Sequence, residues 1–268
     1  MKWFAISTHG RASRAIRHSQ IEFETFYTVK FCALLLSKLL MALYPSRVTA
    51  VKQHVIMLSS PKGGVGKSSL ARNLAVLAAR AGHQVVGIDY DQQATFSTWT
   101  QRRERVRASI PGLTAIPVIA GQLDNWQAAM KRARAMGAGI IMVDTPPSLE
   151  LNISGIVALA GNANLILVPC QQTQDDVDSA APWMARLIAD KRTRAAFVLN
   201  RSNRRAKSFS TIRAKLLAVG PVCPVEVPQL EEIPLASGKG LGVMDLSRPA
   251  SGEVFESLWS YTAREIGL

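Results

Sequence analysis

Two lysines and two serines beside a run of glycines are the residues of this sequence best suited to binding a phosphate. They occur in the stretch Pro61-Lys62-Gly63-Gly64-Val65-Gly66-Lys67-Ser68-Ser69. Glycines let the backbone curl so that several N–H groups face one point, and the helix predicted from Lys67 onward adds its partial positive charge there. Lys67 would reach the β- and γ-phosphates of a nucleotide, and the Ser68 hydroxyl would complete the shell of a Mg²⁺ ion. The expected phosphate-binding residues are Gly63, Gly64, Val65, Gly66, Lys67, Ser68 and Ser69.

Three aspartates at the ends of apolar runs would supply the carboxylates of such a site. Asp89 and Asp91 stand at alternate positions after the run 84–88, so on an extended segment they point the same way. One carboxylate that positions a water accelerates its attack on a γ-phosphate, although two solvated turn aspartates would give the same spacing. Asp144 follows the apolar run 139–143, which is typical of an aspartate that holds Mg²⁺ through water. The expected metal site consists of Ser68, Asp89 and Asp144.

Apolar and helical segments that alternate from His54 onward must position these side chains. Such alternation is typical of a parallel sheet covered on both faces, in which ligands bind at the carboxyl ends of the strands. Strands are expected at 54–59, 85–89, 115–119, 139–144, 165–169, 195–199 and 222–226. Helices are expected near 67–81, 123–136, 151–161, 175–190, 207–219 and 252–266. The predicted fold class is therefore α/β.

Lys62 makes the glycine loop unusual, because a standard phosphate-binding loop needs no cation at that position. With this lysine, and with Asp144-Thr145-Pro146-Pro147 after the fourth strand, the sequence resembles the deviant Walker-A ATPases of the ParA/MinD family. The resemblance is to the small ParA type and covers roughly residues 54–266. It implies a P-loop NTPase with a mostly parallel, twisted sheet of about seven strands and helices on both faces. It also implies ATP hydrolysis, with ATP and Mg²⁺ as cofactors.

The resemblance further implies roles for individual residues. Lys62 would cross a dimer interface to the nucleotide of the other subunit, and Asp91 would orient the attacking water, so Lys62, Lys67 and Asp91 are the expected catalytic residues. Asn200 would read the adenine, helped by Pro228 after the last strand. An asparagine amide offers a donor and an acceptor, which suits an adenine edge, but a structural turn asparagine is the alternative at this position.

A strongly basic segment lies between Lys191 and Lys215, where nine basic residues occur without an acidic one. A solvated surface normally mixes signs, so this segment is the best candidate for contact with the phosphates of DNA. No helix-turn-helix or zinc-finger spacing is visible, so binding should be independent of sequence and sensitive to salt. A second basic run, 102–107, either contributes to DNA binding or forms a solvated helix face. The expected DNA-binding residues are Arg201, Arg204, Arg205, Lys207 and Arg213.

Charge and composition divide the 268 residues into a basic extension, 1–53, and an ATPase domain, 54–268. The net charge of +13 predicts attraction to a polyanion. The extension carries eight basic and two acidic residues, and we expect it to be poorly ordered and dispensable for ATPase function. Its apolar segment 26–44 is interrupted by Lys30 and Lys38, so a membrane span is not expected. Three scattered cysteines indicate neither a disulfide framework nor a metal cluster, which favours the cytoplasm.

The expected function is that of a partitioning ATPase on the nucleoid. By resemblance, ATP would join two subunits, the dimer would bind DNA without sequence preference, and a ParB-type centromere-binding or cargo-adaptor protein would stimulate hydrolysis. The segment 251–261 predicts a packed amphipathic helix that contains acidic residues. The membrane-binding branch of the family ends instead in a short basic amphipathic tail, so this segment favours the DNA-partitioning branch. Two alternatives stay open: a positioning ATPase for a protein cargo, such as a chemotaxis, flagellar or polysaccharide-synthesis complex, and a MinD-like, membrane-associated regulator.

Overall fold

The computed structural model describes residues 52–147, 153–189 and 193–268. The predictions made for residues 1–51, including the basic extension and its apolar segment, lie outside the described residues. Among the described residues, no helix is both long enough and apolar enough to cross a membrane.

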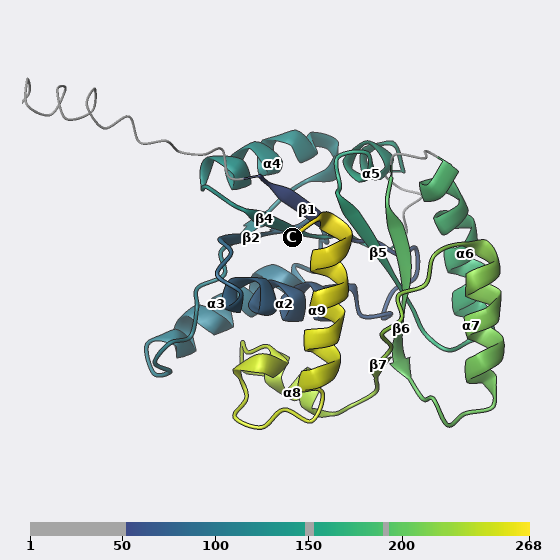
Figure 1. Ribbon diagram of the computed structural model, residues 1–268. Helices are drawn as coiled ribbons and strands as arrows, with labels where there is room; N and C mark the ends of the chain where they lie inside the picture. The colour runs from purple at the N-terminus through teal and green to yellow at the C-terminus, as the bar shows by residue number, and fades with distance from the viewer. Residues whose placement is uncertain (1–51, 148–152, 190–192) are drawn as a thin grey trace, which may run out of the picture. The chain divides into compact units, whose positions relative to one another are not determined.

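Seven parallel strands form a single sheet in the order β3-β2-β4-β1-β5-β6-β7 (Figure 1). Their bounds are β1 His54–Leu58, β2 Val85–Asp89, β3 Val118–Ala120, β4 Ile140–Asp144, β5 Leu165–Cys170, β6 Ala195–Ser202 and β7 Val227–Pro228. The central strand β1 lies between β4 and β5, so the loop that follows it emerges in the middle of the carboxyl edge. Both edge strands are short, with three residues in β3 and two in β7. The predicted parallel α/β sheet is thus confirmed.

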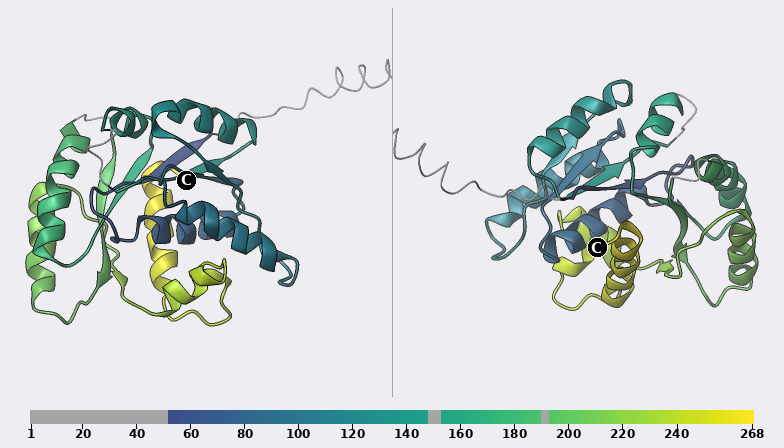
Figure 2. Two further views of the ribbon diagram at one scale, coloured as in Figure 1. Left: turned by 180° about the vertical axis from the view of Figure 1, so that it is seen from behind. Right: turned by 45° about the horizontal axis from the view of Figure 1, so that its top comes forward.

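Helices cover both faces of this sheet (Figure 2). Their bounds are α2 Lys67–Arg80, α3 Thr95–Arg107, α4 Trp126–Ala135, α5 Ile153–Ala160, α6 Gln174–Ala189, α7 Ser208–Val219, α8 Glu232–Gly238 and α9 Gly252–Ile266, with short 3-10 turns at Leu123–Asn125 and Val243–Asp245. Alternate side chains of a strand point to opposite faces. Val55 and Met57 of β1 accordingly join the core under α4, α5, α6 and α7, whereas Ile56 and Leu58 join the core under α2, α3 and α9.

Several elements differ from the sequence expectation. Strand β6 continues to Ser202, so it includes Asn200 and Arg201, and Arg201 adopts a left-handed conformation with φ 52°. The apolar run 222–226 does not form the last strand: Val222 makes an isolated bridge to Phe197, and pairing resumes at β7. Helices α3 and α8 were not among the expected elements.

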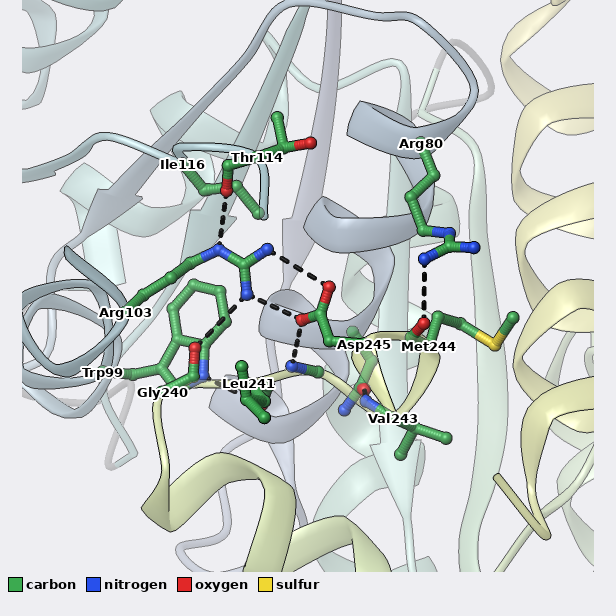
Figure 3. A network of polar contacts seen from close by, with 12 residues as sticks. Arg80, Trp99, Arg103, Thr114, Ile116, Gly240, Leu241, Val243, Met244 and Asp245 are labelled. Atoms are coloured by element: carbon green, nitrogen blue, oxygen red, sulfur yellow. Dashed lines mark hydrogen bonds and ion pairs between the residues drawn. The ribbon is translucent and has the colours of Figure 1, made fainter. Parts of the chain in front are cut away.

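The basic run 102–107 belongs to α3, where Arg103 is a core residue (Figure 3). Its side chain is 1% exposed and pairs with Asp245 at 2.7 Å. Its guanidinium also donates to the carbonyl oxygens of Thr114 and Gly240 and lies over the ring of Trp99. Arg103 therefore ties α3 to the segment that joins α8 to α9, and it is not available to a polyanion.

Candidate functional site

The predicted phosphate-binding loop lies at the carboxyl end of β1 and leads into α2, as the strand–loop–helix pattern requires. Gly64 and Gly66 have φ of 74° and 98°, a region that glycine enters without strain. Among the described residues, no acceptor takes the main-chain N–H groups of Gly63, Gly64, Val65 and Gly66. Free N–H groups at the start of a helix form a binding site for an anion such as a phosphate.

Two amides from neighbouring strand ends brace this loop. Asn200 donates to the carbonyl oxygen of Val65 at 2.7 Å, and Gln171 donates to that of Gly64 at 3.1 Å. A Cβ on Gly66 would lie 2.1 Å from the Asn200 Nδ2 atom. Glycine is therefore needed at this position for two reasons: its positive φ, and the absence of a Cβ that would overlap with the Asn200 amide.

Lys67 lies inside the loop that it would serve. Its side chain is buried, and its Nζ donates to the carbonyl oxygen of Lys62 at 3.0 Å. Burial lowers the pKa of the Lys67 ammonium, while the charges of Asp144 and Asp91 oppose that shift. A buried ammonium among unpaired N–H groups is suited to the β- and γ-phosphates of a nucleotide.

Lys62 makes an ion pair within its own chain. Its Nζ lies 3.0 Å from Oδ1 of Asp176, in the first turn of α6. The Asp176 side chain is 4% exposed, and its other oxygen accepts from the Thr173 hydroxyl at 2.5 Å. The Lys62 side chain remains 39% exposed, so it can leave this partner without crossing the protein interior. Sequence reasoning did not find Asp176.

The predicted carboxylates meet where β2 and β4 end side by side. Asp89 and Asp144 are register partners, and both are buried. Asp89 accepts hydrogen bonds from the main-chain N–H groups of Asp91 and Ser97 at 3.1 and 2.8 Å. Asp91 is only partly buried and borders, with Asp89, a cavity of about 540 Å³. The charges of Asp91 and Asp144 act on the Lys67 ammonium, so these carboxylates and the loop lie at the same end of the sheet.

Asp144 fits a cation. Its side chain is fully buried, and neither carboxylate oxygen has a hydrogen-bond partner of good geometry among the described residues. Burial raises its pKa to about 7, while the nearby Ser68 hydroxyl and the charges of Lys67 and Arg72 oppose this shift. An unpaired buried carboxylate is costly unless a positive partner reaches it. No group of three or more His, Cys, Asp or Glu side chains that could hold a metal exists in the described part of the chain. Mg²⁺ would therefore need the Ser68 hydroxyl and phosphate oxygens besides the carboxylates.

Arg72 is a second residue that sequence reasoning missed. It lies one helical turn after Ser68 on α2, is 9% exposed, and its Nε has no hydrogen-bond partner among the described residues. Burial lowers its pKa to about 10, and the nearby charges of Asp144 and Asp89 oppose this shift. The guanidinium therefore supplies positive charge beneath the carboxylates. The sequence offered one signal for this residue: in the helical pattern of 67–80, Arg72 falls among the buried positions of α2.

A wide cavity of about 1020 Å³ opens beside β6 and β7. Pro228, the residue expected at the base, lines it together with Arg201, Arg204 and Arg205. Asn200 is buried and directs its amide to the phosphate-binding loop instead. Asn200 and Pro228 lie on paired strands, since Asn200 pairs with Val227, but only Pro228 borders the cavity, while the Asn200 amide braces the loop.

The five residues expected to bind DNA divide into two groups. Arg201, Arg205 and Lys207 are exposed and form no ion pair with any described residue. Arg204 and Arg213 both pair with Glu226.

The cysteines Cys170 and Cys223 are buried and free, and burial raises the pKa of their thiols to about 12 and 11. Neither is suited to act as a nucleophile.

This fold and the loop at its centre define a P-loop nucleotide-binding protein. The sequence profile of the CobQ/CobB/MinD/ParA nucleotide binding domain matches residues 56–243. The chain belongs to this family of nucleotide-binding ATPases, which confirms the resemblance drawn from the loop.

Individual relatives cover parts of the chain. The chromosome-partitioning ATPase Soj of Thermus thermophilus is 30% identical, over 51% of this chain and 62% of its own length. The maintenance of carboxysome distribution protein A of Gloeobacter kilaueensis is 26% identical, over 57% of this chain and 65% of its own length. The match thus spans less than two thirds of either relative. The structure of septum site-determining protein MinD from Pyrococcus horikoshii, complexed with Mg-ADP, has a TM-score of 0.61 at 15% identity and covers 80% of this chain and 98% of that one.

Proposed function

We propose that this protein is a ParA-type ATPase that binds ATP with Mg²⁺ and hydrolyses it to ADP and phosphate. The observation that carries the proposal is the loop after β1, where four main-chain N–H groups without an acceptor among the described residues lie beside the buried Lys67 at the carboxyl end of the strand. Lys67 would bind the phosphates, and Ser68, Asp89 and Asp144 would hold the metal, which would neutralise charge on the transferring phosphoryl group. Asp91, more exposed than the other two aspartates, would hold the attacking water.

Lys62 supports the further proposal that ATP joins two subunits. A lysine at the mouth of the loop whose side chain is 39% exposed can exchange Asp176 for a phosphate of a neighbouring subunit. The positive charge of Lys62 would then favour the dimer only when a nucleoside triphosphate is bound.

DNA is the proposed polyanion, bound through its backbone and without sequence preference. The support is a surface on β6, the loop 203–207 and α7 that carries six basic residues, the five expected to bind DNA and Lys215. One such patch binds weakly, whereas two patches held together by dimerisation bind far more tightly. The nucleotide state would therefore control DNA binding, and a ParB-type partner that stimulates hydrolysis would release the cargo from the nucleoid.

A protein cargo is the second candidate. The similarity to the carboxysome distribution protein favours it. The ATP cycle and the binding to DNA would then be the same, and only the adaptor protein would differ. A membrane-associated role would depend on residues 26–44, which lie outside the described residues.

The experiment is co-sedimentation of the protein with random-sequence duplex DNA in the presence of ATP, ADP or no nucleotide. We expect binding with ATP alone. Lys67→Ala should abolish nucleotide binding and with it DNA binding, whereas Asp91→Ala should keep ATP-dependent DNA binding and lose turnover. DNA binding that is indifferent to the nucleotide would contradict the proposed switch.

A further inference from the structure

Glu226 is a buried carboxylate in the middle of the basic surface. It directly precedes β7, and its side chain is 4% exposed. Arg204 donates to its Oε2 atom from Nε at 3.1 Å and from Nη2 at 2.5 Å. Arg213 of α7 donates from Nε to the other oxygen, Oε1, at 3.3 Å. Each carboxylate oxygen is thus occupied by an arginine from a different segment.

These two arginines face solvent although their partner does not. The Arg204 side chain is 71% exposed and that of Arg213 is 31% exposed, so a phosphate could reach either one. Arginine binds carboxylates and phosphates through the same pair of N–H groups. Glu226 occupies the Nε and Nη2 donors of Arg204 and the Nε donor of Arg213, so a phosphate that approached either arginine through these donors would have to displace the carboxylate.

The other three of the five residues expected to bind DNA have no such competitor among the described residues. Arg201, Arg205 and Lys207 are exposed and unpaired there. Their loop is held in place by polar contacts: the Arg205 N–H donates to Asn203 Oδ1 at 3.0 Å, and the Asn203 N–H donates to Gln172 Oε1 at 2.8 Å. These three side chains are thus presented without a competing carboxylate.

We propose that Glu226 is an internal competitor for DNA phosphates: it withholds Arg204 and Arg213, so that each subunit engages the duplex backbone through Arg201, Arg205 and Lys207. The inference rests on the proposed DNA-binding function. Its consequence is a patch too weak to hold DNA as a single subunit, which makes binding depend on the dimer.

The test is Glu226→Gln, which keeps the shape of the side chain and removes its charge. Binding to a random-sequence duplex, measured by fluorescence anisotropy with ATP and Mg²⁺ over a salt series, should tighten roughly tenfold, and the salt slope should steepen by about two per subunit because two arginines become available. The matched control is Glu253→Gln. Glu253 lines the same cavity but pairs with no arginine among the described residues, so its variant should bind as the wild type does.

Alanine variants locate the effect. Arg204→Ala and Arg213→Ala should leave the salt slope of the wild type unchanged, yet each should remove part of the gain in the Glu226→Gln background. Arg205→Ala should lower the slope by about one per subunit in both backgrounds. Equal tightening by Glu226→Gln and Glu253→Gln would reduce the effect to net charge and overturn the proposal.

Elution from immobilised heparin separates this inference from the proposed function. If the wild type binds no DNA in any nucleotide state, the proposed function fails; later elution of Glu226→Gln, but not of Glu253→Gln, would still support competition for the arginines. If DNA is bound and Glu226→Gln binds no more tightly, competition is overturned. Should Glu226→Gln not fold, a lower salt slope in the single variant Arg204→Ala would overturn it instead, and an unchanged slope would support it.

Discussion

Lys62 and Gly66 show how single residues of the phosphate-binding loop depend on partners far away in the sequence. Lys62 pairs with Asp176 of α6, and Gly66 makes room for the amide of Asn200 at the end of β6. Each contact joins the loop to a strand end or helix start that also borders the candidate site. Both can be tested by substitutions that change little else.

Asp176→Asn should favour dimerisation. The variant removes the negative partner of Lys62, and a partly exposed ion pair of this kind contributes about 1 kcal/mol or less. Because two such pairs would open in each dimer, the ATP-dependent dimer should form at up to roughly thirtyfold lower protein concentration. Sedimentation velocity with a non-hydrolysable ATP analogue and Mg²⁺ measures this. The control is Asp175→Asn, an exposed neighbour on the same helix turn, which should leave the dimer constant unchanged; an equal effect of both variants would contradict a specific role for the pair.

Gly66→Ala should destabilise the protein and weaken nucleotide binding. The added Cβ meets the Asn200 amide at 2.1 Å, and the positive φ adds a strain of about 1 kcal/mol or more. Gly64→Ala is the matched control, because Gly64 also has a positive φ but has no atom within 4 Å of the added Cβ. Urea unfolding should show the larger loss for Gly66→Ala. The double variant Gly66→Ala/Asn200→Gly should regain part of it, and failure to do so would contradict the steric explanation.

At the scale of elements, α3 shows where the sequence pattern was hard to read. The buried residues of this helix are Phe96, Trp99 and Arg103, a helical spacing in which the third position carries a charge. A helix prediction based on apolar periodicity counts that arginine as a polar residue and so loses the pattern. The partner that makes its burial possible, Asp245, lies 142 residues later, and no local reading of the sequence joins the two.

Asp245→Ala should destabilise the fold by about 3–5 kcal/mol, because it leaves a buried guanidinium without its carboxylate. The double variant Arg103→Met/Asp245→Leu should recover most of this loss, since an apolar pair needs no counter-charge. Chemical denaturation measures both. Glu104→Ala, which breaks the exposed pair with Arg107 on the same helix, should change stability by less than about 0.5 kcal/mol; a loss as large as that of Asp245→Ala would argue against burial as the cause.

The sequence predicted most of the sheet and the core of the candidate site because both depend on local patterns. The glycine loop and Asp144 each follow an apolar strand, and β2 and α9 have the bounds expected of them. Two kinds of feature were missed. The pairings of Lys62 with Asp176 and of Glu226 with Arg204 and Arg213 join distant segments. The last strand was misplaced because the run 222–226 makes a single bridge, from Val222 to Phe197, and regular pairing resumes only at β7.

At the scale of the whole molecule, the described part of the chain contains a seven-stranded sheet with helices on both of its faces. The seven strands run from His54 to Pro228, and both faces of the sheet are covered by helices that end at Ile266. The hydrophobic core is built from these elements. We therefore expect folding to require little from residues 1–50.

A chain that begins at Val51 should unfold cooperatively, with a Tm within a few degrees of that of the full-length protein, and should hydrolyse ATP at the same rate. Circular dichroism and a phosphate-release assay measure these quantities. Loss of both ATP turnover and DNA binding would contradict the assignment of residues 1–53 as dispensable.

The two edges of the sheet limit how copies of the protein can associate. One edge offers the three residues of β3, and the other offers the two residues of β7, of which Pro228 has no N–H group to donate. Neither is a usable template for strand addition, so two copies cannot extend one continuous sheet across their contact. Association through the loops of the carboxyl edge, where Lys62 lies, would need neither edge strand, and short edges of this kind also protect against edge-to-edge aggregation.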